Sequence, residues 1–120
     1  MAHKGQRGIK RAWNALFYSL DGLKSAWRKE QAFVEESVLF VILAPTALWL
    51  GDSGLERAVL LACLFLVMVV ELLNSAIEAV VDRFGDEWHE LAKQAKDMGS
   101  AAVLLALINT VVVWALVIFN

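Results

Sequence analysis

Apolar residues gather along this chain in four blocks, of which the first has the periodicity of an amphipathic helix. In residues 9–29 large apolar side chains return every three or four positions with charged side chains between them, which predicts an amphipathic helix lying on a membrane surface. Residues 33–50, 55–82 and 100–119 are apolar around most of the helix. Because about 20 apolar residues cross the hydrocarbon of a bilayer, these three ranges predict membrane spans.

Polar segments separate the predicted spans. Residues 51–54, Gly-Asp-Ser-Gly, form a loop by composition between the first two spans. Gly85 is expected to end or bend the second span, and the polar segment from Asp86 to Asp97 then connects it to the third. No repeat or low-complexity stretch interrupts this order, so we expect residues 1–120 to form a single domain.

The composition agrees with a membrane protein. Of the 120 residues, 59% are hydrophobic, and the mean hydropathy is +0.59. A chain of this length cannot bury so much apolar surface within itself, so lipid must cover part of it. The expected fold is therefore all-α, with three transmembrane helices and an N-terminal surface helix.

The net charge gives no support for nucleic-acid binding, and the cysteine content excludes an intrachain disulfide. The formal net charge of -2 offers no basic excess for nucleic acid. The single Cys63 lies in an apolar run and cannot form an intrachain disulfide, so it is expected to be a packed small side chain. The segment from Met1 to Lys10 is polar and basic, and we expect no removable signal peptide there.

Basic residues predict the orientation of the spans. Seven Lys or Arg residues precede Glu36, one (Arg57) flanks the first loop, three lie between Arg83 and Lys96, and none follows the third span. The positive-inside rule places the N-terminus and the 83–98 segment in the cytoplasm. The charged chemistry is thereby gathered on the cytoplasmic side.

An acidic stripe on the second span is the main candidate for function. At 100° per residue, Glu71, Asn74, Ser75, Glu78 and Asp82 fall within about a 100° sector of one helix face. Carboxylates near hydrocarbon are costly unless they are paired, hydrated or neutralised by a cation. The stripe therefore requires compensation, and for Asp82 an ordinary ion pair is the expected one.

A divalent cation is the compensation that also suggests chemistry. Mg²⁺ commonly takes one or two carboxylates together with water and phosphate oxygens, so Glu78 with an acid from elsewhere in the chain is the expected kind of site, and Glu30 is a candidate for that acid. Glu71, at the predicted lipid boundary, could act as a base on a hydroxyl group arriving from the membrane. Neither a GxxxxGK[ST] loop nor a protein-kinase motif is present, so the nucleotide would need another cradle.

Three motifs make the chain recognisable. They are ELLNSAIEAVVDR at 71–83, HEL at 89–91 and AKDMGSAAV at 95–103. With Tyr18-Ser19 and Glu30 in the preceding region, they resemble the prokaryotic diacylglycerol kinase family over nearly the whole chain. The resemblance implies an inner-membrane homotrimer that transfers the γ-phosphate of ATP to diacylglycerol, with active sites between subunits at the cytoplasmic surface.

The resemblance also implies roles for individual residues. Glu71 is the expected general base, with Asn74 ordering the base and the lipid hydroxyl. Glu30 and Glu78 are the expected Mg²⁺ ligands. The residues implied for ATP and its metal are Arg11, Tyr18, Glu30, Glu78, Glu87, Trp88, His89, Glu90, Leu91, Lys96 and Asp97.

The implied lipid site contains Glu71 together with polar and aromatic residues from three segments. Its other members are Ser19, Phe33, Glu36 and Ser100. The chain departs from the family pattern at Leu16-Phe17, where a small pair is common, and at Val34, where a basic residue is often found. The first departure could reshape the lipid pocket, and the second removes a possible phosphate contact.

Other functions are compatible with parts of the pattern. A related enzyme class phosphorylates undecaprenol, and the alternative lipid stays open at this point. A small proton-coupled transporter usually has four spans with an acid deep in the first, whereas this chain has three spans and acids near one surface. A non-catalytic scaffold would explain the spans but not the combination of Glu30, Glu71 and Glu78.

Overall fold

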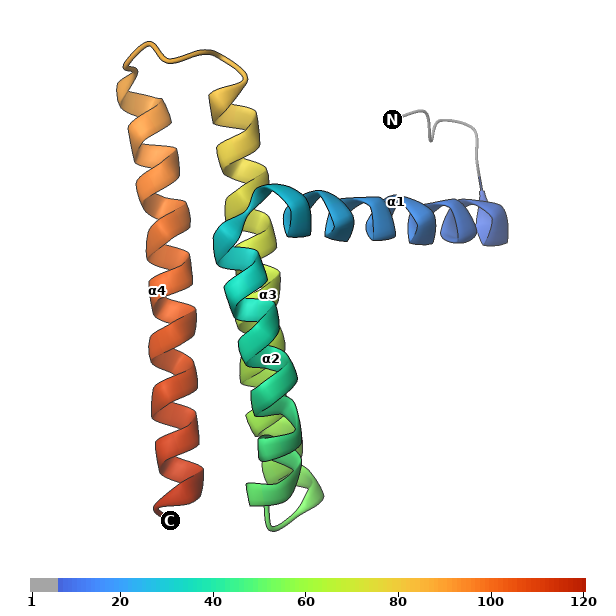
Figure 1. The fold of residues 1–120 in the computed structure, drawn as a ribbon, viewed down its shortest axis with the longest axis vertical. Coiled ribbons are helices and arrows are strands. Elements are labelled where there is room, and N and C mark those ends of the chain that lie inside the picture. The colour runs from blue at the N-terminus through green and yellow to red at the C-terminus, as the bar shows by residue number, and fades with distance from the viewer. Residues whose placement is uncertain (1–6) are drawn as a thin grey trace.

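The computed structural model describes residues 7–120, which form four α-helices joined by short connections (Figure 1). Within this range there is no β-strand. Three of the helices, α2, α3 and α4, are long and apolar enough to cross a membrane. This confirms the predicted all-helical membrane fold. The helices are α1 (Gly8–Lys29), α2 (Gln31–Leu50), α3 (Gly54–Asp82) and α4 (Glu90–Ile118).

Helix α3 is central, because α2 and α4 both pack against it. Its buried residues recur at intervals of three or four, with Cys63 and Leu64 adjacent, and lie on one face, as the apolar stripe of a packed helix requires. A cross-helix hydrogen bond reinforces the α3–α4 contact, because the Trp114 indole Nε1 donates to the Leu60 carbonyl at 3.3 Å. The Thr110 hydroxyl lies 3.5 Å from the Cys63 carbonyl, but its shorter bond, at 2.9 Å, is to the Ala106 carbonyl of its own helix. The buried residues of α3 are Leu60, Cys63, Leu64, Val67 and Glu71.

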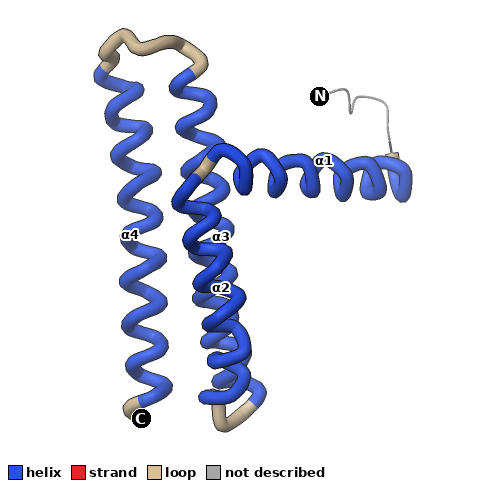
Figure 2. The backbone as a smooth tube through the Cα atoms, in the orientation of Figure 1, coloured by secondary structure: helices blue, strands red, loops and turns tan. Residues whose placement is uncertain are grey.

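Helix α1 runs roughly perpendicular to the spans and extends away from them to one side, as Figures 1 and 2 show. Its Trp13, Leu20 and Trp27 side chains are exposed in the single chain, and Ala26 is its one buried residue among those described. An exposed apolar face on a helix perpendicular to the spans is the arrangement of an interfacial helix. The predicted surface helix is therefore present at its expected position.

The α2–α3 connection is tight and polar at its ends. The Ser53 hydroxyl accepts the Glu56 N–H at 3.1 Å and caps α3, while the Glu56 carboxylate accepts the Asp52 N–H at 3.0 Å. The Arg57 Nε donates to the Leu48 carbonyl at 3.1 Å, which satisfies one of the last carbonyls of α2. These bonds explain why a connection of so few residues can reverse the chain.

The third span begins earlier than the sequence predicted. We expected a polar connection up to Asp97 and a helix from about residue 100, but α4 starts at Glu90. His89 caps it, because its Nδ1 accepts the Leu91 N–H at 3.1 Å, and Lys93 pairs with Asp97 at 2.6 Å one turn apart. The segment is polar because it extends the helix beyond the apolar layer, not because it is a loop.

Gly85 was expected to end or bend the second span; α3 ends three residues earlier, at Asp82, and Gly85 lies in the connection that follows. Its φ of 96° lies in the left-handed region, where a residue without Cβ carries no steric penalty. The chain therefore turns after Asp82 and returns to α4 within residues 83–89, at the end of α3 that extends past α1 in Figure 1.

Candidate active site

The acidic stripe of α3 continues the helix face that is buried against α2 and α4. Leu60, Leu64 and Val67 precede Glu71 at helical spacing on this face. Glu71 follows them on this face and is only 5% exposed. The single chain therefore already shields Glu71, whereas farther along the stripe Glu78 is partly exposed and Asp82 is exposed.

Other carboxylates surround Glu71. Those of Glu30, Glu36 and Glu78 are close enough to repel its charge. Glu30 lies in extended backbone, φ -115° and ψ 105°, at the junction between surface helix α1 and span α2. Glu71 is therefore at the level where the chain passes from the membrane surface into a span, which agrees with its predicted place at the lipid boundary.

Asn74 links the middle of the stripe to α4. Its Nδ2 donates to the Glu78 carboxylate at 3.3 Å. Its Oδ1 is buried and has no hydrogen-bond partner among the described residues. Gly99 of α4 lies directly beside this amide, where the absence of a Cβ lets the two helices approach closely.

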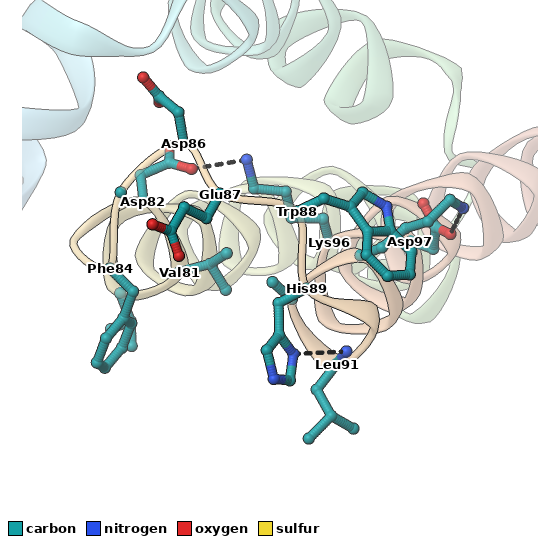
Figure 3. Close-up of a pocket in the computed structure, with 14 residues that line it drawn as sticks. Val81, Asp82, Phe84, Asp86, Glu87, Trp88, His89, Leu91, Lys96 and Asp97 are labelled. Atoms are coloured by element: carbon teal, nitrogen blue, oxygen red, sulfur yellow. Dashed lines mark hydrogen bonds and ion pairs between the residues drawn. The ribbon is translucent and has the colours of Figure 1, made fainter.

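A cavity of about 850 Å³ opens between the end of α3 and the start of α4 (Figure 3). Its walls combine aromatic side chains, including Phe84 and Trp88, with both acidic and basic ones. Lys96 donates to Asp82 across it at 2.6 Å. Its lining residues are Val80, Val81, Asp82, Phe84, Gly85, Asp86, Glu87, Trp88, His89, Leu91, Ala92, Lys93, Lys96 and Asp97.

Part of the set of residues predicted to bind ATP and its metal lines this cavity. Six of those residues line it, and Glu90 sits beside them as the first residue of α4. The other four predicted residues are elsewhere: Arg11 and Tyr18 on α1, Glu30 at the α1–α2 junction and Glu78 on α3. The six are Glu87, Trp88, His89, Leu91, Lys96 and Asp97.

The predicted lipid residues are not gathered in one cavity. Phe33 is buried at the start of α2, whereas Ser19 on α1 and Ser100 on α4 are exposed. Glu36 lines a smaller cavity of about 100 Å³, whose other walls are mainly Leu, Val and Phe side chains from α2, α3 and α4. Glu36 therefore borders an apolar space, as expected for a residue beside an acyl chain.

Sequence reasoning overlooked several residues of the larger cavity. Phe84, Asp86 and Lys93 were assigned no role, yet all three line it. The spacing of Lys93 and Asp97, four residues apart with opposite charge, was a signal for helix in this segment. Asp82 was expected to be structural and paired, and it is paired, with Lys96 rather than with the adjacent Arg83.

The described residues do not form a closed metal cage. Among residues 7–120 no group of three or more His, Cys, Asp or Glu side chains could hold a metal ion by itself. The two carboxylates predicted as ligands, Glu30 and Glu78, both lie in the electrostatic neighbourhood of Glu71. An ion held there would need further oxygens from outside the chain.

Comparisons with known proteins all point to the same family. The family model for prokaryotic diacylglycerol kinase matches residues 17–118. The diacylglycerol kinase of Escherichia coli strain K12 is 48% identical over 113 residues, which cover 94% of this chain and 93% of that protein. The Pseudomonas aeruginosa diacylglycerol kinase is 51% identical over 117 residues, covering 98% and 95%. That of Haemophilus influenzae is 46% identical over 112 residues, covering 93% and 95%.

Proposed function

The chain belongs to the prokaryotic diacylglycerol kinase family, and from that premise we propose how its residues perform the reaction. It is an ATP-dependent lipid kinase: the γ-phosphate of ATP passes to the free hydroxyl of diacylglycerol, giving phosphatidic acid and ADP. Family membership carries the reaction, because the named relatives cover nearly the full chain. The undecaprenol alternative is not favoured, since these relatives are named for diacylglycerol.

Glu71 is proposed as the general base. Its carboxylate would accept the proton of the lipid hydroxyl while that oxygen bonds to the γ-phosphorus and the bond to ADP breaks. The observation that supports this assignment is its burial on the inner face of α3, at the level where α1 meets α2. A hydroxyl at the glycerol end of a membrane lipid reaches this level without leaving the bilayer.

Glu30 and Glu78 are proposed to hold Mg²⁺ together with the nucleotide phosphates. Bound Mg²⁺ would neutralise charge on the phosphates during transfer. The donor set fits such an ion, because carboxylate oxygens are its preferred protein ligands and the acidic cluster around Glu71 needs a compensating cation. Asn74 would orient Glu78 through the hydrogen bond between their side chains.

The larger cavity is proposed as part of the ATP site. Lys96 would offset phosphate charge, and Trp88, which is 75% exposed at the cavity, offers a face for a nucleotide base. Arg11 and Tyr18 on α1 would complete the site from the surface-helix side. The remaining contributors are Glu87, His89, Glu90, Leu91 and Asp97.

The lipid is proposed to approach along α1 and the start of α2. Ser19 and Ser100 would contact the glycerol region, while Phe33 and Glu36 border the acyl chains. The small apolar cavity beside Glu36 supports this direction of approach.

We further propose a homotrimer in the bacterial inner membrane, with the N-terminus and the 83–98 segment cytoplasmic. The distribution of Lys and Arg supports the orientation. The half-exposed positions of Asn74 and Glu78 support an active site that a second subunit completes, because polar groups at this depth favour protein neighbours over lipid.

One assay tests the proposed function. Purified wild-type protein in mixed micelles receives labelled ATP, Mg²⁺ and either diacylglycerol or undecaprenol. We expect label in phosphatidic acid and little in the undecaprenol product. Transfer to undecaprenol alone would replace the lipid assignment, and transfer to neither lipid would reject the kinase assignment.

A further inference from the structure

Asp82 and Lys96 form an ion pair that closes one side of the larger cavity. The Lys96 Nζ lies 2.6 Å from the Asp82 carboxylate. Asp82 is the last residue of α3, and Lys96 lies in the second turn of α4. The pair therefore joins the two helices across the seven connecting residues 83–89 (Figure 3).

The pair is too exposed to contribute much to folding. The Lys96 and Asp82 side chains are 45% and 63% exposed. Exposed ion pairs contribute little to stability, because water screens the charges and holding two side chains costs entropy. Stability is therefore a weak explanation for placing this pair at the cavity.

Orientation of the lysine is a better explanation. A lysine ammonium sits on a flexible four-carbon stem and loses much conformational freedom when it is fixed. Asp82 is its direct partner, and Glu78 and Asp86 also attract the ammonium from the same end of α3. The Lys96 ammonium is consequently held on the α3 side of the cavity, next to the helix that carries Glu78.

We propose that Asp82 is a positioning residue that holds Lys96 where the phosphates of ATP bind. This inference rests on the proposed function, in which Lys96 contacts phosphate and Glu78 holds Mg²⁺. Asp82 itself contacts neither the transferred phosphate nor the lipid. Its carboxylate keeps the ammonium in place before ATP arrives, so that binding does not have to order a free lysine.

The effect should appear in nucleotide binding rather than in the chemical step. A contact with the substrate that is equally strong in the ground state and in the transition state affects KM and leaves kcat largely unchanged. We expect Asp82→Asn to raise KM for ATP about tenfold, with kcat within about twofold and KM for diacylglycerol unchanged. Asp82→Glu, which keeps the charge, should recover most of the lost affinity.

The test is a double-mutant cycle measured with the full-length protein in mixed micelles. Asp82→Asn and Lys96→Gln are made singly and together, with Asp82→Ala as a second removal variant in case one of them folds poorly. If Asp82 acts through Lys96, its removal adds little to KM for ATP once Lys96 is replaced. Asp52→Asn is the matched control, because it makes the same change at an exposed position beside the opposite end of α3.

Three results would overturn the inference: an unchanged KM for ATP in both removal variants, a lower KM, or the same fold increase with and without Lys96. A lower KM would mean that Asp82 competes with phosphate for the lysine. These results leave the wild-type activity intact and therefore spare the proposed function. A wild-type protein that transfers no phosphate to either lipid would instead reject the proposed function and this inference together.

Discussion

Gly99 of α4 lies directly against the side-chain amide of Asn74 on α3. A Cβ built at Gly99 would overlap the Asn74 Oδ1 and lie 3.3 Å from its Cγ. The same amide donates from Nδ2 to Glu78 at 3.3 Å. Glycine at position 99 thus lets α4 approach closely enough to fix the orientation of a side chain that contacts a proposed metal ligand.

Gly99→Ala is therefore expected to destabilise the α3–α4 contact. Overpacking of this kind costs about 1–3 kcal/mol of unfolding free energy. The measurement is denaturant unfolding in mixed micelles for Gly99→Ala, Asn74→Ala and the double variant. Since Asn74→Ala removes the atoms that the new methyl group meets, Gly99→Ala should cost less in that background. Equal costs in both backgrounds would contradict the contact.

Glu71→Gln is expected to stop turnover without removing the nucleotide site. Loss of a general base lowers kcat by about 10²- to 10⁴-fold, whereas the nucleotide contacts proposed here are made by other residues. Equilibrium binding of Mg²⁺-ATP and the rate of phosphatidic acid formation are measured on the same preparation. Glu56→Gln, at the other end of α3, is the matched control. A near-normal rate for Glu71→Gln would reject the base assignment.

Glu78→Gln is expected to weaken the response to Mg²⁺. Loss of a residue that merely orients a metal ligand commonly costs about 10- to 100-fold in affinity or activity, so loss of a direct ligand should cost at least as much. The concentration of Mg²⁺ that gives half-maximal activity should rise by more than about tenfold, and ATP binding should weaken with it. Because Glu71→Gln is expected to be inactive, its dependence on Mg²⁺ is measured by nucleotide binding instead. The Mg²⁺ concentration needed for half-maximal binding is not expected to rise in this variant. An unchanged Mg²⁺ requirement in Glu78→Gln would show that Glu78 is not a ligand of the metal.

Trp114→Phe is expected to weaken packing but not catalysis. It removes a donor that reaches the Leu60 carbonyl of α3 from α4, and hydrogen bonds between membrane helices average about 0.6 kcal/mol. Unfolding in mixed micelles should show a loss of about this size, with kcat unchanged. Thr46→Val is the control, since that hydroxyl bonds to Ile42 within its own helix. A loss as large in the control would argue against the cross-helix bond.

Cysteine labelling checks the proposed orientation. In a Cys63→Ala background, Asp52→Cys should react with a membrane-impermeant maleimide in intact cells, because the 51–54 segment faces outward under the positive-inside rule. Gln94→Cys, exposed near the start of α4, should react only after the cells are opened. The reverse labelling pattern would show that the orientation in the membrane is opposite to the one proposed.

The sequence alone determined the helices and their environment. Periodicity and apolar length predict a surface helix and three spans, and these elements are present with bounds close to those expected. This succeeds because local spacing and the thickness of the bilayer constrain helices without reference to the rest of the fold. The prediction from the sequence failed at residues 90–99, where a polar segment was taken for a loop. In the structure α4 already includes this segment and extends there beyond the apolar layer.

Tertiary structure decided the direction and partners of the acidic stripe. Helical spacing placed Glu71, Glu78 and Asp82 on one face, but it could not state that this face continues the packing surface of α3 and buries Glu71. Nor could it choose Lys96 as the partner of Asp82, or place Gly99 against Asn74. Such contacts depend on how separate helices cross and on the turn at residues 83–89, which are set by packing over the whole chain rather than by neighbouring residues in the sequence.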